Sequence, residues 1–128
     1  SLHAPNQALR ESLIPIAKQN KLDDLMNILD EYVKVTNQRI SYEYILLNNV
    51  NDSTKEANEL VELLTGRLAH VNLIRYNKIN EGEFNRSEQQ HINNFCSILD
   101  RNRINYTVRV SLGTDIDGAC GQLTANNS

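Results

Sequence analysis

The alternation of strand-like and helix-like segments constrains the fold of this chain more than any other feature. Runs rich in Ile, Val and Tyr cover residues 39–47, 68–76 and 105–111, as expected for strands. Apolar residues recur at helical spacing in 54–64 and 87–102, between those runs. Strands that alternate with helices are typical of parallel β/α units. We therefore predict an α/β fold built on a parallel sheet.

The chain before residue 39 is predicted to contribute one more strand end and two helices. Residues 1–3 have the character of the end of a strand, and a helix is expected at about 6–13, where Pro15 interrupts it. A second helix is expected from about 22 to 35. Its predicted apolar stripe consists of Leu22, Leu25, Ile28, Leu29, Tyr32 and Val33. The whole sheet would then have about four strands, too few to close a barrel alone.

Two of the helix starts have capping-box spacing, in which a serine is followed three residues later by Glu or Gln. The pairs are Ser53 with Glu56 and Ser87 with Gln90. We therefore expect a serine hydroxyl to cap the helix at both positions.

Polar and small residues gather directly after the predicted strands, at 1–6, 48–52, 77–80 and 111–120. In parallel α/β folds the carboxyl ends of the strands share one edge, and ligands bind there. The pattern alone therefore predicts a binding site at this edge.

Several side chains at these positions could contact a ligand, and each also has a structural alternative. His3 offers an imidazole, but it could equally cap or pack at the end of a strand. Asn77, or Asn72 in the same strand, could bind a ribose hydroxyl or an amino-acid group, although asparagines often satisfy their own turns. Glu43 could face a ligand or point outward.

The chain has two cysteines, in contrasting surroundings. Cys120 lies in the glycine-rich stretch 113–123, where glycines let the backbone bend tightly, so its sulfur is predicted to be exposed. The neighbouring Asp115 and Asp117 disfavour a thiolate, so the sequence alone does not say what the sulfur does. Cys96 lies on an apolar helical face and is predicted to pack in the core.

Bulk properties exclude several classes of protein. The net charge of −3 argues against a self-sufficient nucleic-acid binder, because phosphate contacts need clustered Lys and Arg. Two distant cysteines form no disulfide framework, which favours a reducing, cytoplasmic setting. No apolar run approaches the roughly 18 residues of a membrane span. His70 and His91 have no metal-ligand spacing, so no metal site is expected from this chain.

Five stretches of the sequence, in this order, resemble the RlmN/Cfr family of radical S-adenosylmethionine (radical-SAM) RNA methyltransferases. They are SLHAPN at 1–6, EYILLNNVNDS at 43–53, HVNLIRYN at 70–77, TVR at 107–109 and DIDGACGQL at 115–123. Family members also carry a C-x-x-x-C-x-x-C iron–sulfur motif, which this sequence lacks. The chain thus resembles the C-terminal part of a larger enzyme.

The resemblance implies a fold and a chemistry. Residues 1–123 would form the C-terminal portion of a parallel (β/α) partial barrel of radical-SAM type, followed by a flexible tail at 124–128. It implies that Cys120 receives a methyl group from S-adenosylmethionine and passes it, after radical activation, to a ring carbon of an adenosine in 23S ribosomal RNA. The residues that match the cofactor-binding positions of the family are Ser1, Leu2, His3 and Asn77.

Further partners follow from the same resemblance. A [4Fe–4S] cluster would be held by ligands outside this chain, and a protein such as flavodoxin would supply electrons. Transfer RNA would be a second substrate in some members. RlmN-like members methylate C2 of the adenine, and Cfr-like members methylate C8 and confer antibiotic resistance; Arg75 stands where RlmN-like members usually have proline.

Two other interpretations remain open: a flavodoxin-like binding module that does not need Cys120, and a fragment that is inactive without its missing part. The isolated chain is expected to self-associate, because an open sheet has unpaired edges and the missing part would leave apolar side chains uncovered. The side chains expected to be exposed are Ile45, Leu47, Val71 and Leu73.

Overall fold

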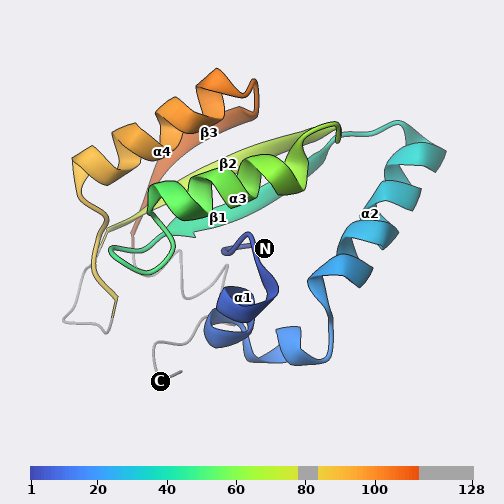
Figure 1. Cartoon of the computed structure of the whole chain (residues 1–128), viewed down its shortest axis with the longest axis horizontal. Helices are drawn as coiled ribbons and strands as arrows, with labels where there is room; N and C mark the ends of the chain where they lie inside the picture. The colour runs from blue at the N-terminus through green and yellow to red at the C-terminus, as the bar shows by residue number, and fades with distance from the viewer. Residues whose placement is uncertain (78–83, 113–128) are drawn as a thin grey trace.

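A computed structural model describes residues 1–77 and 84–112, and its centre is a three-stranded parallel sheet in the order β1-β2-β3 (Figure 1). Helices α3 and α4 connect successive strands and pack on the same face of the sheet (Figure 1). The predicted α/β fold with a parallel sheet is therefore confirmed. The bounds are β1 Ile40–Leu46, α3 Thr54–Leu64, β2 Ala69–Asn77, α4 Gln89–Arg101 and β3 Asn105–Leu112.

The chain before the sheet forms helix α1, Gln7–Leu13, a 3₁₀ turn at Pro15–Lys18, and helix α2, Leu22–Thr36. The side chain of Asn6 caps α1 by accepting a hydrogen bond from the amide of Leu9 at 2.8 Å. Pro15 ends α1 as predicted, because proline has no amide hydrogen to donate. Within the described residues, no helix is long and apolar enough to cross a membrane.

Residues 1–3 lie beside β1 but do not form a fourth strand. The amide of Leu2 donates to the carbonyl of Glu43 at 2.9 Å, and no further ladder follows. The backbone of His3 has a φ of 59°, a left-handed conformation that turns the chain away from the sheet. The described part therefore has three strands rather than about four.

Two apolar clusters cover the two faces of the sheet. The larger one joins the sheet to α3 and α4, and in it the rings of Tyr44 and Phe95 contact each other in a tilted arrangement with centroids 5.4 Å apart. The smaller one seats α1 and the 3₁₀ turn against the carboxyl half of β1 and β2. The expectation that four strand residues would be exposed is wrong, because these clusters bury them. Their exposed fractions are 0% for Ile45, 1% for Leu47, 0% for Val71 and 0% for Leu73.

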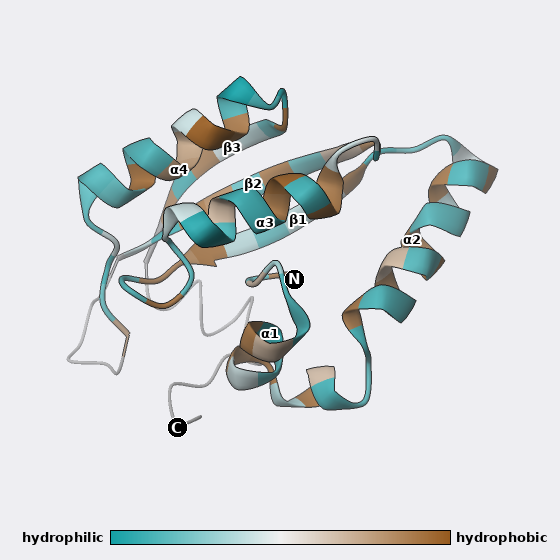
Figure 2. Ribbon diagram, in the orientation of Figure 1, coloured by the Kyte–Doolittle hydropathy of each residue, from teal (hydrophilic) through white to brown (hydrophobic). Residues whose placement is uncertain are grey.

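Helix α2 departs from its predicted apolar stripe. Leu22 and Met26 are buried in the larger cluster, and Met26 was absent from the prediction. Ile28 is 66% exposed and Tyr32 is 45% exposed, so these two members of the predicted stripe face away from the core. Apolar and polar residues are interspersed along α2 (Figure 2). The sequence could not show this, because the apolar residues of α2 occupy two sides of the helix and only one side meets the sheet.

The two predicted capping boxes have opposite outcomes. Ser53 accepts from the amide of Glu56, and the Glu56 carboxylate accepts from the amide of Ser53, which completes the box at α3. At α4 the N-cap residue is Glu88, one position later than predicted, and it makes no side-chain capping bond. Ser87 is buried instead, and its hydroxyl has no hydrogen-bond partner among the described residues.

Candidate functional site

The carboxyl ends of the three parallel strands share one edge, which is the predicted location of the site. Ile45 of β1 lies beside Ile74 of β2, and the backbone of Asn77 lies beside Leu112 of β3. His3 reaches the same end of the sheet through its contact with Ile45. Cys120, with Asp115 and Asp117, lies outside the described residues, as does the tail at 124–128.

The imidazole of His3 forms a hydrogen bond with the backbone near the end of β1. Its Nδ1 accepts a hydrogen bond from the amide of Ile45 at 3.0 Å, which is the strand-end contact named above as its structural alternative. The side chain is 1% exposed, and burial, helped by the positive charges of the amino terminus and Arg10, lowers the pKa of His3 to about 3. The ring is therefore neutral at pH 7.

Because Nδ1 of His3 is the acceptor, the proton of the neutral ring is on Nε2. Nε2 is buried, and no described residue accepts its hydrogen bond. Buried donors without acceptors are uncommon and costly. His3 thus has one nitrogen committed to the fold and one buried N–H group without an acceptor among the described residues.

Ser1 and Leu2 contribute fewer polar groups than His3 to this edge of the sheet. The side chain of Leu2 is 1% exposed and belongs to the larger apolar cluster, so its role in the described structure is packing. Ser1 is exposed, and its carbonyl accepts from Nη2 of Arg10 at 3.3 Å. The structure therefore brings His3 and the backbone of Asn77 to one edge, whereas the side chain of Leu2 points into the core.

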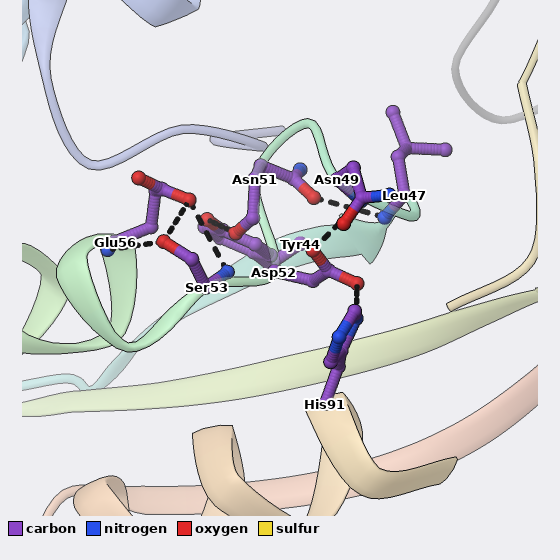
Figure 3. Close-up of polar contacts among 8 residues, drawn as sticks. All are labelled: Tyr44, Leu47, Asn49, Asn51, Asp52, Ser53, Glu56 and His91. Carbon is purple, nitrogen blue, oxygen red and sulfur yellow. Dashed lines mark hydrogen bonds and ion pairs between the residues drawn. The ribbon is translucent and has the colours of Figure 1, made fainter. Parts of the chain in front are cut away.

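Asn51 connects the amino-terminal segment to the end of β1, and sequence reasoning missed it. Its side-chain amide donates to the carbonyls of His3 and Ile45, each at 2.8 Å, and its Oδ1 accepts from the amide of Leu47 at 2.9 Å. The hydroxyl of Tyr44 donates to the Asn51 carbonyl at 2.7 Å (Figure 3). Asn51 is 0% exposed. The sequence does show that Asn51 belongs to a polar loop after β1, but it does not show that the side chain of Asn51 is buried.

Asp52 and His91 form a second connection, between the loop after β1 and helix α4 (Figure 3). His91 Nδ1 lies 3.0 Å from Asp52 Oδ2, and the amide of Asn49 donates to Oδ1 at 3.0 Å. Asp52 is only 2% exposed, so both bonds satisfy a buried carboxylate. From the sequence, His91 was considered only as a metal ligand, and its pairing with Asp52 was not identified. Within the described residues no three His, Cys, Asp or Glu side chains form a metal-binding group.

A row of polar side chains crosses the sheet on the face opposite α3 and α4. The Thr107 hydroxyl donates to Asn72 Oδ1 at 2.8 Å, and Asn72 Nδ2 donates to Glu43 Oε1 at 3.2 Å. Nη2 of Arg109 lies 3.9 Å from the other Glu43 oxygen. Glu43 and Asn72, both left undecided by the sequence, thus bind each other. Every second residue of these strands is polar here, and this periodicity was the signal for the row.

Cys96 is partly buried against the larger apolar cluster, as predicted. Burial raises the pKa of its thiol above the ordinary value, which disfavours the thiolate. Its surroundings are therefore those of a packing residue rather than a nucleophile.

Comparison with known proteins identifies relatives along almost the entire chain, although no family model matches it. A probable dual-specificity RNA methyltransferase RlmN of Lachnoclostridium phytofermentans is 48% identical over 96% of this chain and 35% of its own length. The protein of the same description from Synechococcus elongatus is 45% identical over 100% of this chain and 36% of its own.

The fold has a solved counterpart. The crystal structure of a radical SAM methyltransferase from Sphaerobacter thermophilus aligns with a TM-score of 0.83 and 44% identity, covering 98% of this chain and 37% of that one. The three-stranded sheet is thus a portion of a radical-SAM (β/α) partial barrel. The chain spans little more than a third of the length of the relatives it matches. It belongs to the RlmN/Cfr family of radical-SAM methyltransferases and corresponds to the C-terminal part of its members.

Proposed function

We propose that this chain is the C-terminal part of a cytoplasmic enzyme that methylates a ring carbon of an adenosine in 23S ribosomal RNA, with transfer RNA as a further substrate. The observation that carries the proposal is the 48% identity to a probable dual-specificity RNA methyltransferase over 96% of this chain. The net charge of −3 implies that most contacts to RNA phosphates come from the rest of the protein.

The edge of the sheet is suited to hold S-adenosylmethionine, which would supply the methyl group and, at a reduced [4Fe–4S] cluster, the radical that activates it. The buried Nε2–H of His3 has no acceptor among the described residues, and a carboxylate or hydroxyl of the cofactor would provide one. Ser1, Leu2, His3 and Asn77 would hold it, with Leu2 contributing through its backbone because its side chain is buried.

The cluster itself does not fit residues of this chain. The whole sequence has two cysteines, and the described residues contain no group of three potential ligands. The ligands would come from polypeptide outside this chain, and a reductant such as flavodoxin would supply the electrons. Anaerobic reconstitution of the chain alone should therefore give no stoichiometric iron and sulfide.

Cys120 would carry the methyl group as a thioether. Carbon atoms of the adenine ring are poor nucleophiles, so direct transfer from a sulfonium does not reach them, and a carrier on the protein solves this problem. Glycines on both sides of Cys120 would let the backbone move the sulfur between cofactor and RNA.

We place the methyl group on C2, because the relatives from Lachnoclostridium phytofermentans and Synechococcus elongatus are both described as RlmN. Arg75, in place of the proline usual in RlmN-like members, is the residue that favours C8 and with it antibiotic resistance. In β2 its Nη1 donates to Gln89 of α4 at 3.1 Å, so its position is defined by α4. Mass spectrometry of the modified nucleoside distinguishes the two carbons.

The decisive experiment compares Cys120→Ala with Cys96→Ala in the full-length enzyme. Cys120→Ala should abolish methylation of 23S ribosomal RNA, whereas Cys96→Ala should leave the modified nucleoside in place and lower stability only. Methylation that survives in the Cys120 variant would refute the role assigned to Cys120. A purified, cluster-loaded full-length enzyme that modifies no RNA at all would contradict the proposed function as a whole.

A further inference from the structure

Two arginines flank the carboxyl end of β1, at the edge where the three parallel strands end. Arg75 of β2 is the register partner of Leu46, the last residue of β1. Arg86 pairs through its backbone with Leu47, the next residue along the chain. Both guanidinium groups are therefore attached to backbone at the edge where the proposed function places the cofactor.

The side chain of Arg75 is oriented by helix α4. Its Nη1 donates to Gln89 Oε1 at 3.1 Å, and Gln89 Nε2 donates in turn to Asn93 Oδ1 at 2.8 Å. Because Gln89 is neutral, this bond orients the guanidinium without compensating its charge. A guanidinium that is already oriented loses less conformational freedom when it binds a further acceptor.

Carboxylates compensate the charge of other arginines on the sheet and on its connections, but not the charge of these two. Arg67 and Arg109 each have a carboxylate partner, at 2.8 Å and 3.9 Å. Within residues 1–77 and 84–112, no carboxylate forms an ion pair with Arg75 or Arg86. Arg86 is also exposed. Two positive charges at this edge are thus available to an anionic ligand.

We propose that Arg75 and Arg86 bind phosphate groups of the substrate RNA near the adenosine that is methylated. The inference rests on the proposed function and names a contact that this part of the enzyme makes with its substrate. The fork of an arginine matches the oxygens of a phosphate, and such contacts position a nucleic acid without reading its sequence. Because the chain as a whole has a net charge of −3, local positive charges favour the approach of the RNA backbone to this edge.

The test measures the affinity of the full-length enzyme for a 23S ribosomal RNA fragment at several KCl concentrations, by fluorescence anisotropy. Each phosphate contact contributes about 0.7 to 0.9 to the slope of log affinity against log salt concentration. The double variant Arg75→Gln with Arg86→Gln should therefore have a slope that is shallower by about 1.5, and it should bind at least about tenfold more weakly at low salt. Arg39→Gln is the matched control, because Arg39 is exposed just before β1, at the opposite edge of the sheet, and should leave the slope unchanged.

Lysine at positions 75 and 86 separates a contact with RNA from a structural role. Lysine keeps the positive charge, so Arg75→Lys with Arg86→Lys should retain most of the slope, and a slope as shallow as that of the glutamine variant would contradict the proposal. Arg86→Gln alone repeats the measurement if the Arg75 variants do not fold, and it should reduce the slope by about 0.7. An unchanged slope in the glutamine variants would overturn this inference and leave the proposed function standing. A parent enzyme that neither binds nor methylates the RNA fragment would overturn both.

Discussion

The buried side chain of Asn51 donates a hydrogen bond to the carbonyl of His3 at 2.8 Å and so ties the first residues of the chain to the end of β1. The same amide group donates to the carbonyl of Ile45, also at 2.8 Å, and Oδ1 accepts from Leu47. One buried side chain thus satisfies three backbone groups. The position of His3 at the edge of the sheet depends on it.

Replacing Asn51 with alanine should lower the free energy of unfolding by about 3 kcal/mol, because buried backbone groups lose their partners. Urea denaturation measures the loss. Asn27→Ala is the control, since Asn27 is exposed on α2 and should change stability by less than about 0.5 kcal/mol. Equal effects of the two substitutions would show that the contacts of Asn51 are not important for stability.

Much of this fold is readable from the sequence, because its local signals agree with its packing. The strands that contain Tyr44 and Leu73 are rich in β-branched and aromatic residues. The capping-box spacing of Ser53 and Glu56 predicts the start of α3. From α1 to β3 the predicted order of strands and helices is found in the structure, and only the predicted strand end at residues 1–3 is missing. The edge that would carry a ligand also follows from the order of elements alone, because parallel strands end on one side.

The other features of the structure depend on contacts between residues that are far apart in the sequence, and no local sequence pattern predicts such contacts. Asn51 and Asp52 look like ordinary loop residues, yet both are buried by partners up to 48 residues away in sequence. The face of α2 that meets the sheet was misassigned because Ile28 and Met26 are equally apolar and only packing chooses between them. Of the four strand residues expected to be exposed, Ile45 and Leu47 are buried because α1 and the 3₁₀ turn cover the second face of the sheet, and Val71 and Leu73 are buried under α3 and α4.

The burial of His3 predicts a dependence of stability on pH. Its pKa is about 3 in the folded protein and near 6.5 when unfolded, so the unfolded chain binds the proton more readily. The neutral ring contributes full stability above pH 6.5. Stability should fall by up to about 1.4 kcal/mol per pH unit as the pH decreases from 6.5 toward 3.

His3→Asn isolates this contribution, since its side-chain oxygen can still accept from Ile45 but does not titrate. The melting temperature of the parent chain should decrease more steeply between pH 7.5 and pH 5 than that of the variant. Parallel curves would mean that His3 is accessible to protons in the folded state.

Removal of His91 should destabilise the protein through Asp52. The Asp52 carboxylate is 2% exposed, so His91→Ala leaves it with the amide of Asn49 as its remaining described partner. We expect a loss of about 1–3 kcal/mol. Asn94→Ala changes an exposed neighbour on the same helix and serves as the control. A loss no greater than that of the control would show that the pair is held too loosely to matter.

The 128-residue chain on its own should self-associate, through surfaces other than those the sequence suggested. Most of the exposed large apolar side chains among the described residues lie on α2 and on β3, where Val108 is 45% and Val110 is 67% exposed. On α2 the stripe of Ile28, Tyr32 and Val35 has no cover within the described residues. Burying these side chains between two copies would stabilise a dimer by roughly 25 cal/mol for each Å² of apolar surface removed from water.

Sedimentation equilibrium at several concentrations separates the two surfaces. Ile28→Ser with Tyr32→Ser should shift the chain toward monomer if α2 is the contact, while Val108→Thr with Val110→Thr should do so if β3 is the contact. We expect the α2 pair to have the larger effect, because Ile28 and Tyr32 lie with Val35 on one face of the helix, whereas the β3 side chains belong to a single strand. A parent chain that remains monomeric at high concentration would show that the exposed apolar surface is too small to drive association.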